Sequence, residues 1–216
     1  MPYRILHAPG EHEVRSPPPA LACVNLFRYG NEMTPTRFKL QLMSASEIDR
    51  TLVRLAHEIL EKTKDLDKLA LVGIRRRGVP LAARLAKKIE SLENRTIPVG
   101  ELDINLYRDD LSTVGVAPVV NSTHIPFEVT GRDIVLTDDV LYTGRTIRAA
   151  LDALFERGRP ARVQLLVLID RGHRELPIAA RYVGRTIQTS SNEIVEVKFQ
   201  EIDNAEKVIL VEKVSD

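Results

Sequence analysis

The sequence predicts an α/β fold in which a mainly parallel central sheet is flanked by helices. Short apolar runs typical of buried strands alternate with amphipathic segments typical of helices along most of the chain. Strands that alternate with helices form βαβ units, whose crossover connections leave neighbouring strands parallel. A length of 216 residues and a hydrophobic fraction of 44% indicate one globular domain of ordinary size with a sizeable core.

The expected elements follow one another in a regular order. Ser46 is the expected N-cap of a first helix, whose apolar stripe consists of Ile48, Leu52, Leu55, Ile59 and Leu60. "LALVGI" predicts a buried strand, and a helix with Pro80 in its first turn follows it. Further strands are expected at residues 97–106, 133–138 and 162–170, with a helix closed by Gly158 between the last two. Two edge strands at residues 194–203 and 207–212 make the C-terminal edge rich in β-structure.

Residues 1–42 differ from the rest of the chain. They contain a triple proline and show no sustained apolar period, so we expect an unstructured N-terminal extension. Met43 would serve as a natural start, and residues 43–216 are expected to form the domain.

Composition excludes several classes of protein. A net charge of +1 gives no overall attraction to nucleic acid or an anionic membrane, although a local basic patch stays possible. One cysteine, Cys23, excludes an internal disulfide and fits a reducing compartment. No apolar run is long enough to span a bilayer, and the N-terminus lacks the features of a signal peptide. We therefore expect a cytoplasmic protein.

The most informative stretch is "DIVLTDDVLYTGRT", at residues 133–146. Two adjacent carboxylates, Asp138 and Asp139, end an apolar strand, where they cost stability unless a cation or a hydroxyl-rich ligand lies beside them. The following turn offers backbone N–H groups, a glycine and the hydroxyls of Thr143 and Thr146 at the start of a helix. Such a turn suits a phosphate monoester, while the acids suit a ribose diol beside Mg²⁺. The glycine-lysine spacing of a P-loop and the glycine triplet of a dinucleotide site are absent.

This stretch resembles the signature of type I phosphoribosyltransferases, which bind 5-phosphoribosyl-1-pyrophosphate (PRPP). The alternative is that the two acids merely cap a turn. The resemblance implies that Asp138 and Asp139 are catalytic and hold Mg²⁺, mainly through PRPP. It implies that PRPP is bound by Val140, Leu141, Tyr142, Thr143, Gly144, Arg145 and Thr146.

Two other segments also resemble functional loops of this family. "VGIRRRG" resembles the pyrophosphate-binding loop of the family, which often has a non-proline cis peptide near the positions of Gly73 and Ile74. The residues concerned are Gly73, Ile74, Arg75, Arg76, Arg77 and Gly78. By itself, this loop would be interpreted as a solvated turn. Residues 108–125 resemble the family's flexible lid, including Arg108, Asp109 and Asp110, although a passive surface loop is the alternative.

Tyr142 limits which bases the site could accept. Phosphoribosyltransferases for 6-oxopurines usually carry an acid at this position, and a phenol with a pKa near ~10 is a poor proton acceptor at neutral pH. Residues 100–111, 138–146 and 168–184 together resemble the bifunctional pyrimidine operon regulators, which are also uracil phosphoribosyltransferases. The similarity extends from about residue 43 to the C-terminus.

The resemblance to this family implies a reaction in which uracil and Mg²⁺-PRPP give UMP and pyrophosphate. Uracil would lie under a small hood, built from residues 170–184, and contact Asp170, Arg171, Tyr182 and Val183, with Tyr182 stacking on or flanking the base. The alternative for Tyr182 is an ordinary core position.

The family also binds the leader RNA of pyrimidine operons, favoured by uridine nucleotides such as UMP and UTP. The residues that match the family's RNA contacts are His57, His173 and Arg174. Val53 and Ala179 replace a threonine and an arginine of the family pattern, which would weaken RNA binding. For His57 a helix-surface or dimer contact, and for Arg174 a salt bridge in the hood, are the alternatives. The resemblance also suggests homo-oligomers, dimers or higher.

Three functions therefore stay open at this point. The first is a uracil phosphoribosyltransferase with RNA binding retained or weakened, which the pyrophosphate loop and the lid favour. The second is an RNA-binding regulator that uses the PRPP site only to sense nucleotides. The third is a 6-oxopurine phosphoribosyltransferase.

Overall fold

Two sheets and three main helices make up the computed structural model, which describes residues 24–29, 32–104 and 123–214, with side chains from residue 35 onward. The larger sheet is five-stranded and parallel, with the strand order β4-β3-β5-β6-β7. Its strands are β3 (Leu69–Ile74), β4 (Val99–Leu102), β5 (Asp133–Leu141), β6 (Arg162–Asp170) and β7 (Tyr182–Thr186). The predicted α/β class and its parallel sheet are confirmed.

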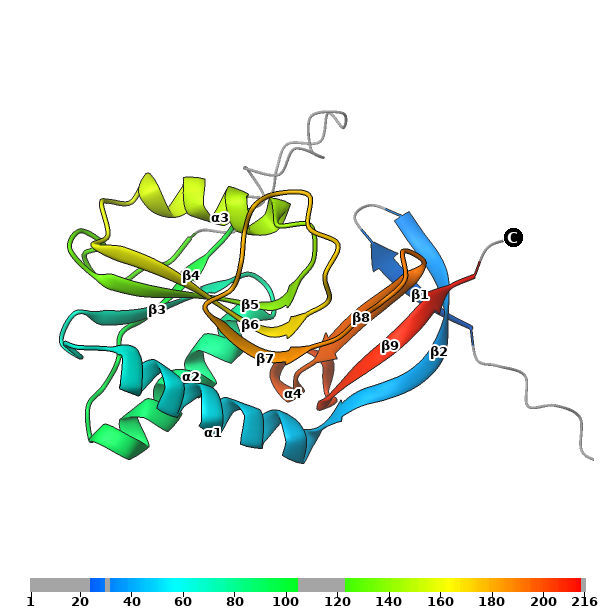
Figure 1. Cartoon of the computed structure of the whole chain (residues 1–216), viewed down its shortest axis with the longest axis horizontal. Helices are drawn as coiled ribbons and strands as arrows, with labels where there is room; N and C mark the ends of the chain where they lie inside the picture. Colours follow the sequence, from blue (N-terminus) through cyan, green and yellow to red (C-terminus); the bar gives the residue numbers. More distant parts are fainter. Residues whose placement is uncertain (1–23, 30–31, 105–122, 215–216) are drawn as a thin grey trace, which may run out of the picture.

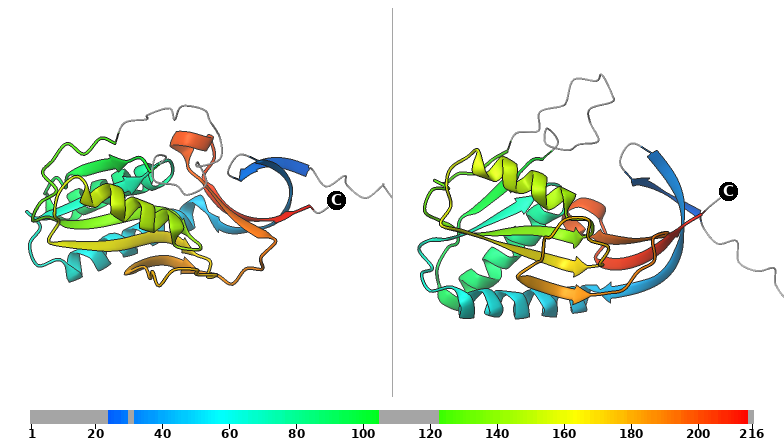
Figure 2. Two further views of the ribbon diagram at one scale, coloured as in Figure 1. Left: turned by 90° about the horizontal axis from the view of Figure 1, so that it is seen from above. Right: turned by 45° about the horizontal axis from the view of Figure 1, so that its top comes forward.

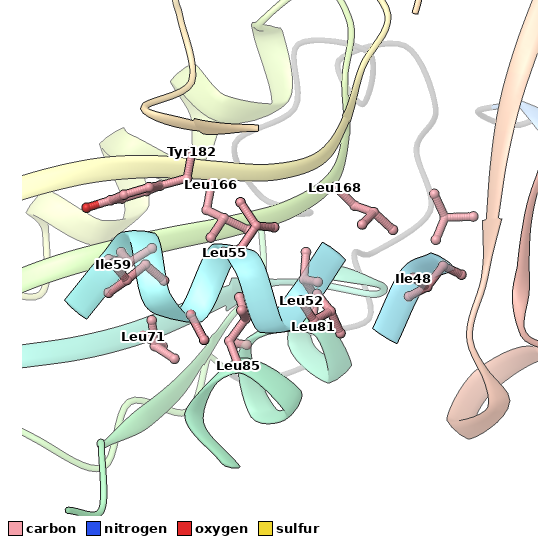
Figure 3. Close-up of a cluster of buried hydrophobic side chains, with 14 of the residues drawn as sticks. Ile48, Leu52, Leu55, Ile59, Leu71, Leu81, Leu85, Leu166, Leu168 and Tyr182 are labelled. Carbon is pink, nitrogen blue, oxygen red and sulfur yellow. The ribbon is translucent and has the colours of Figure 1, made fainter. Parts of the chain in front are cut away.

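Helices cover both faces of this sheet, as Figures 1 and 2 show. On one face lie α1 (Ala45–Lys62) and α2 (Gly78–Glu93), and on the other lies α3 (Arg145–Phe155). The predicted stripe of α1 packs into the core: Ile48, Leu52, Leu55 and Ile59 are all buried (Figure 3). The N-cap of α1 is Ser44, not Ser46, because Ser44 and Glu47 form a reciprocal capping box.

A second, antiparallel sheet of four strands lies beside the first in all three ribbon views, with the order β1-β2-β9-β8. Its strands are β1 (Val24–Tyr29), β2 (Glu32–Ser44), β8 (Glu193–Lys198) and β9 (Lys207–Lys213), and the short helix α4 (Gln200–Asp203) connects β8 to β9. The expected tail strands exist, but the first ends at residue 198 and continues into α4. Moreover, β9 lies between β2 and β8 and is not an edge strand.

The expectation of an unstructured extension over residues 1–42 does not fit the described part of that segment. Strand β2 begins at Glu32 and pairs along β9, from Thr36 opposite Lys213 to Ser44 opposite Lys207. The expected boundary at Met43 therefore falls inside a strand. The sequence signal is a period of two in "RFKLQL", where apolar and polar residues alternate as in a strand, although Phe38 and Leu40 are exposed in the structure.

Candidate active site

The site lies where β3 and β5 end side by side. The two strands are neighbours in the parallel sheet, with Gly73 paired to Thr137, so the loops that follow them share one edge of the sheet. These loops pack without space for extra atoms: a Cβ added to Gly78 would lie 2.3 Å from the Thr137 carbonyl oxygen. The Thr137 hydroxyl donates to the Gly78 carbonyl at 2.9 Å. The predicted pyrophosphate and PRPP loops are thus brought together.

The acidic pair belongs to the last residues of β5. Asp138 is buried and Asp139 is partly buried. The Asp139 amide donates to the Asp138 carboxylate at 2.9 Å, and the Val140 amide donates to Asp139 Oδ1 at 3.0 Å. Burial and then the charge of Asp139 raise the pKa of Asp138, whereas burial raises the pKa of Asp139 against the opposing charge of Arg77. A cationic or hydroxyl-rich ligand would relieve this cost.

The turn after the acids leads directly into α3. Gly144 is the N-cap residue of this helix and has a φ of 95°, a left-handed conformation that favours glycine. The Arg145 amide donates to the Thr143 hydroxyl at 3.3 Å, which tightens the turn. Backbone amides at a helix N-terminus form a site for an anion, so the observed geometry suits the predicted phosphate.

Residues 172–178 hold this turn in place through hydrogen bonds and an ion pair. The Thr143 carbonyl accepts hydrogen bonds from the amides of Glu175 and Leu176, at 3.0 and 3.1 Å. Arg145 pairs through its guanidinium with the Glu175 carboxylate at 2.7 Å. The hood segment is therefore part of the scaffold of the phosphate turn.

Arg174 is the centre of this bracing, and its predicted RNA contact stays a prediction. Its guanidinium is partly buried and pairs with Asp170 at 2.5 Å. The same group donates to the carbonyls of Leu141, Tyr142, Gly172 and Ile178, at 2.6 to 3.3 Å. Since its donors face inward to these acceptors, the structure supports the alternative of a hood salt bridge. Asp170, expected to contact uracil, is likewise engaged by Arg174 and by the Gly172 amide.

A second cluster holds Tyr142 in place. The buried Arg171 guanidinium lies 4.2 Å from the centroid of the Tyr142 ring. It also donates to the carbonyls of Ser190 and Glu193 and to the Thr189 hydroxyl. Arg171 thus joins the hood to the start of β8, and its predicted contact with uracil stays a prediction.

The prediction that Tyr182 contacts uracil is wrong. Its side chain has no exposed surface and packs in the main core with residues of α1 and β6 (Figure 3). Its hydroxyl donates to Gln164 at 3.4 Å, and Lys62 lies 5.1 Å from the ring centroid. Because successive side chains of β7 point to opposite faces, Tyr182 points to the α1 side of the sheet. The carbonyl of Val183, the other predicted contact on this strand, accepts from Arg54 at 2.9 Å.

The three arginines of the pyrophosphate loop have different surroundings. Arg75 pairs with Glu101 at 2.7 Å. Arg77 pairs with Asp203 of α4, also at 2.7 Å. Within the described part of the chain, Arg76 pairs with no carboxylate, and its side chain is exposed. The loop has a non-proline cis peptide between Arg75 and Arg76, directly after the expected position near Gly73 and Ile74.

Asp203 is the site residue that the sequence did not reveal. It follows "KFQEI", which was interpreted as a strand, and 126 residues separate it from Arg77. The available signal was an acid just before Asn204, whose positive φ of 49° ends α4. Such an asparagine is typical of a helix C-terminus, but it does not indicate what the acid contacts.

Of the remaining predicted residues, His173 adjoins the PRPP turn, with its ring centroid 5.9 Å from that of Tyr142 in an edge-to-face contact. His57 is exposed on α1, one turn after the half-exposed Val53. His173 has a φ of 58°, and its Nε2 atom lies 2.6 Å from the Thr189 carbonyl oxygen. Arg108, Asp109 and Asp110 of the predicted lid fall outside the described residues. In the described ranges, no helix combines the length and the apolar character needed to cross a membrane.

Comparison with known proteins identifies the family to which this chain belongs. The sequence profile of the phosphoribosyl transferase domain matches residues 41–202. The protein named bifunctional protein PyrR from Pelotomaculum thermopropionicum is 60% identical over 82% of this chain and 97% of its own length. The chain belongs to the PyrR family of phosphoribosyl transferases.

Further PyrR proteins agree with this assignment. The one from Thermus aquaticus is 58% identical over 82% of this chain and 98% of its own. Among solved structures, a hypoxanthine phosphoribosyltransferase from Trypanosoma cruzi is similar with a TM-score of 0.64 at 20% identity, over 81% of this chain and 95% of the other. The corresponding enzyme from Staphylococcus aureus gives a TM-score of 0.60, also at 20% identity, over 80% and 92% of the two chains. At this identity the hypoxanthine enzymes establish the phosphoribosyltransferase fold, whereas the PyrR proteins establish the family.

Proposed function

We propose that this protein transfers a phosphoribosyl group from PRPP to uracil, giving UMP and pyrophosphate. The observation that carries the proposal is the acidic pair at the end of β5, directly followed by the amide turn at the start of α3 and adjoined by the arginine loop after β3. This arrangement offers acids for a ribose diol, amides for a 5′-phosphate and guanidinium groups for a pyrophosphate.

The residues of the chain act by binding and by electrostatics. The turn from Thr143 to Thr146 fixes the 5′-phosphate and so sets the position of C1′ against the uracil ring nitrogen. Positive charge develops on the ribose as pyrophosphate leaves, and the carboxylates of Asp138 and Asp139 stabilise that charge. No side chain needs to form a covalent bond. The predicted lid would exclude water from this centre.

Magnesium fits the donor set of the site. Asp138 and Asp139 supply oxygen atoms, which Mg²⁺ prefers, and burial makes their unpaired charge costly. The described residues contain no group of three or more potential metal ligands. Mg²⁺ would therefore be held by the acidic pair together with PRPP, whose leaving-group charge it neutralises.

An assay of base specificity tests the proposal. Purified protein, PRPP and Mg²⁺ are mixed with uracil, hypoxanthine, guanine or orotate, and the release of pyrophosphate is measured. We expect pyrophosphate with uracil alone, because Tyr142 is a phenol where a carboxylate would serve a purine. Release with hypoxanthine or guanine would instead establish the 6-oxopurine alternative. No release with any base, while UMP still binds, would favour the nucleotide sensor.

A second function, regulation of pyrimidine operon transcription through leader RNA, is favoured by the name of the relatives, which are called bifunctional. His57, on the exposed face of α1, and His173 are the exposed residues predicted to contact RNA, whereas Arg174 is engaged in the hood. Val53 and Ala179 offer no hydrogen bond or charge to a phosphate, so binding should be weak. Gel shifts with the upstream leader RNA, with and without UMP or UTP, test it. An unaltered RNA mobility at micromolar protein would contradict it.

We also propose a cytoplasmic location, where both substrates and nascent RNA are present, and a homo-oligomeric state. Light scattering at micromolar concentration tests the assembly. A monomer mass would contradict it.

A further inference from the structure

Helix α4 brings a carboxylate to the pyrophosphate loop from the other sheet. This four-residue helix connects β8 and β9, and its last residue, Asp203, faces Arg77. Arg77 Nη2 lies 2.7 Å from Asp203 Oδ1, and Arg77 Nε lies 3.2 Å from Asp203 Oδ2. Oδ2 also accepts from the Phe199 amide at 3.0 Å, which fixes the orientation of the carboxylate. Asp203 thus holds a planar guanidinium at two points.

The loop that carries the held guanidinium adjoins the strand of the acidic pair, because the Thr137 hydroxyl donates to the carbonyl of Gly78, the residue after Arg77, at 2.9 Å. Arg77 is partly buried and close enough to Asp139 for their charges to interact. A guanidinium has five N–H donors, and Asp203 occupies two of them. The remaining donors and the charge can serve an anion that leaves from a ribose beside Asp139.

Asp203 is not needed merely to attach α4 to the parallel domain. Arg84 of α2 already binds both acids that flank it, Glu201 at 2.7 Å and Glu206 at 2.6 Å. Arg84 also lies 4.8 Å from the ring centroid of the buried Phe199. The attachment is therefore made by Arg84, whereas Asp203 acts on an arginine of the loop.

We propose that Asp203 is a positioning residue for pyrophosphate: it orients the Arg77 guanidinium so that the free donors of Arg77 bind the pyrophosphate of PRPP and of the product. This inference rests on the proposed function. Because α4 connects β8 to β9, the second sheet would then contribute a residue to the active site.

Binding calorimetry in the presence of Mg²⁺ separates this role from a structural one. In Asp203→Asn we expect the pyrophosphate dissociation constant and the KM for PRPP to rise roughly tenfold, because a charge-assisted pair is lost. UMP has no pyrophosphate, so its dissociation constant should stay within about twofold. Glu201→Gln is the matched control, because it removes an arginine partner from the same helix but leaves Arg77 untouched; its pyrophosphate affinity should equal that of the wild type.

A double-mutant cycle then tests whether Asp203 acts through Arg77. In an Arg77→Gln background, Asp203→Asn should weaken pyrophosphate binding no further. Unchanged or tighter pyrophosphate binding in Asp203→Asn would overturn the inference, and so would an equal weakening of UMP. The proposed function is judged separately, because its failure would appear in the wild type as no UMP formation from uracil.

Discussion

At the scale of single residues, Asp139 is the group whose replacement most directly tests catalysis. Asn has the same shape, and its amide oxygen can still accept from the Val140 amide, so Asp139→Asn should fold normally. Turnover should fall roughly 10²–10³-fold, because a preorganised charge beside the developing positive ribose is lost. UMP formation and far-UV circular dichroism are the measurements. Wild-type turnover in a folded variant would show that the acidic pair has no catalytic role.

Arg174 is the residue whose role changes most between the sequence and the structure. Arg174→Ala would leave the Tyr142 carbonyl without its side-chain donor, whereas the Leu141 carbonyl keeps the Arg171 amide; an acceptor that loses its partner costs about 1–3 kcal/mol. The KM for PRPP should also rise, because the Tyr142 carbonyl belongs to the phosphate turn. The measurements are urea unfolding and initial rates. Arg95→Ala is the control: its exposed pair with Asp67 should contribute no more than about 1 kcal/mol. Equal stability of the two variants would contradict the bracing role.

At the scale of elements, β2 is the addition that the sequence interpretation missed. Lys39 of β2 reaches diagonally across β9 and pairs with Glu193 at the start of β8. The other oxygen of Glu193 accepts from the Ser190 amide at 2.7 Å. The hydrogen bond from Lys39 and then that from Ser190 lower the pKa of Glu193 to about 2. This pair therefore ties residues from the two ends of the chain into one sheet.

The lowered pKa of Glu193 gives a pH-dependent prediction. A carboxylate whose folded pKa is depressed stabilises the fold above its ordinary value of 4.5, and this contribution declines as the pH falls towards about 2. Glu193→Gln should thus be less stable than the wild type at pH 7, and the difference should shrink between pH 4.5 and pH 2. Thermal unfolding at a series of pH values measures it. A difference that does not vary with pH would mean that the pair does not form, and that β2 is not held as described.

At the scale of the whole molecule, the sequence predicted the parts that local patterns determine. The stripe of α1 and the acids near the end of β5 follow from periodicity and from residue order, and both lie where expected. The misses are contacts between distant segments. Tyr182 is a core residue because its side chain lies on the face of β7 that packs against α1. Asp203 contacts Arg77 only because α4, which connects two strands of the second sheet, lies against the loop after β3. No local pattern in one sequence contains that information.

The stability of the whole molecule should depend on Mg²⁺ only when PRPP is present. The acidic pair has two adjacent carboxylates, and the described residues contain no third ligand to complete a metal site, so chelation should not shift the unfolding of the free protein. PRPP with Mg²⁺, at about 100 times its dissociation constant, should stabilise the fold by about 2.7 kcal/mol. EDTA should abolish most of this gain, because the ribose and pyrophosphate oxygens then meet the buried acids without a cation. UMP should keep its stabilising effect in EDTA, since the amide turn binds its phosphate without metal. Thermal unfolding of the free protein, of the protein with PRPP and Mg²⁺, and of the protein with UMP, each with and without EDTA, measures these shifts. PRPP stabilisation that survives EDTA would show that the acids meet the ligand without an ion between them.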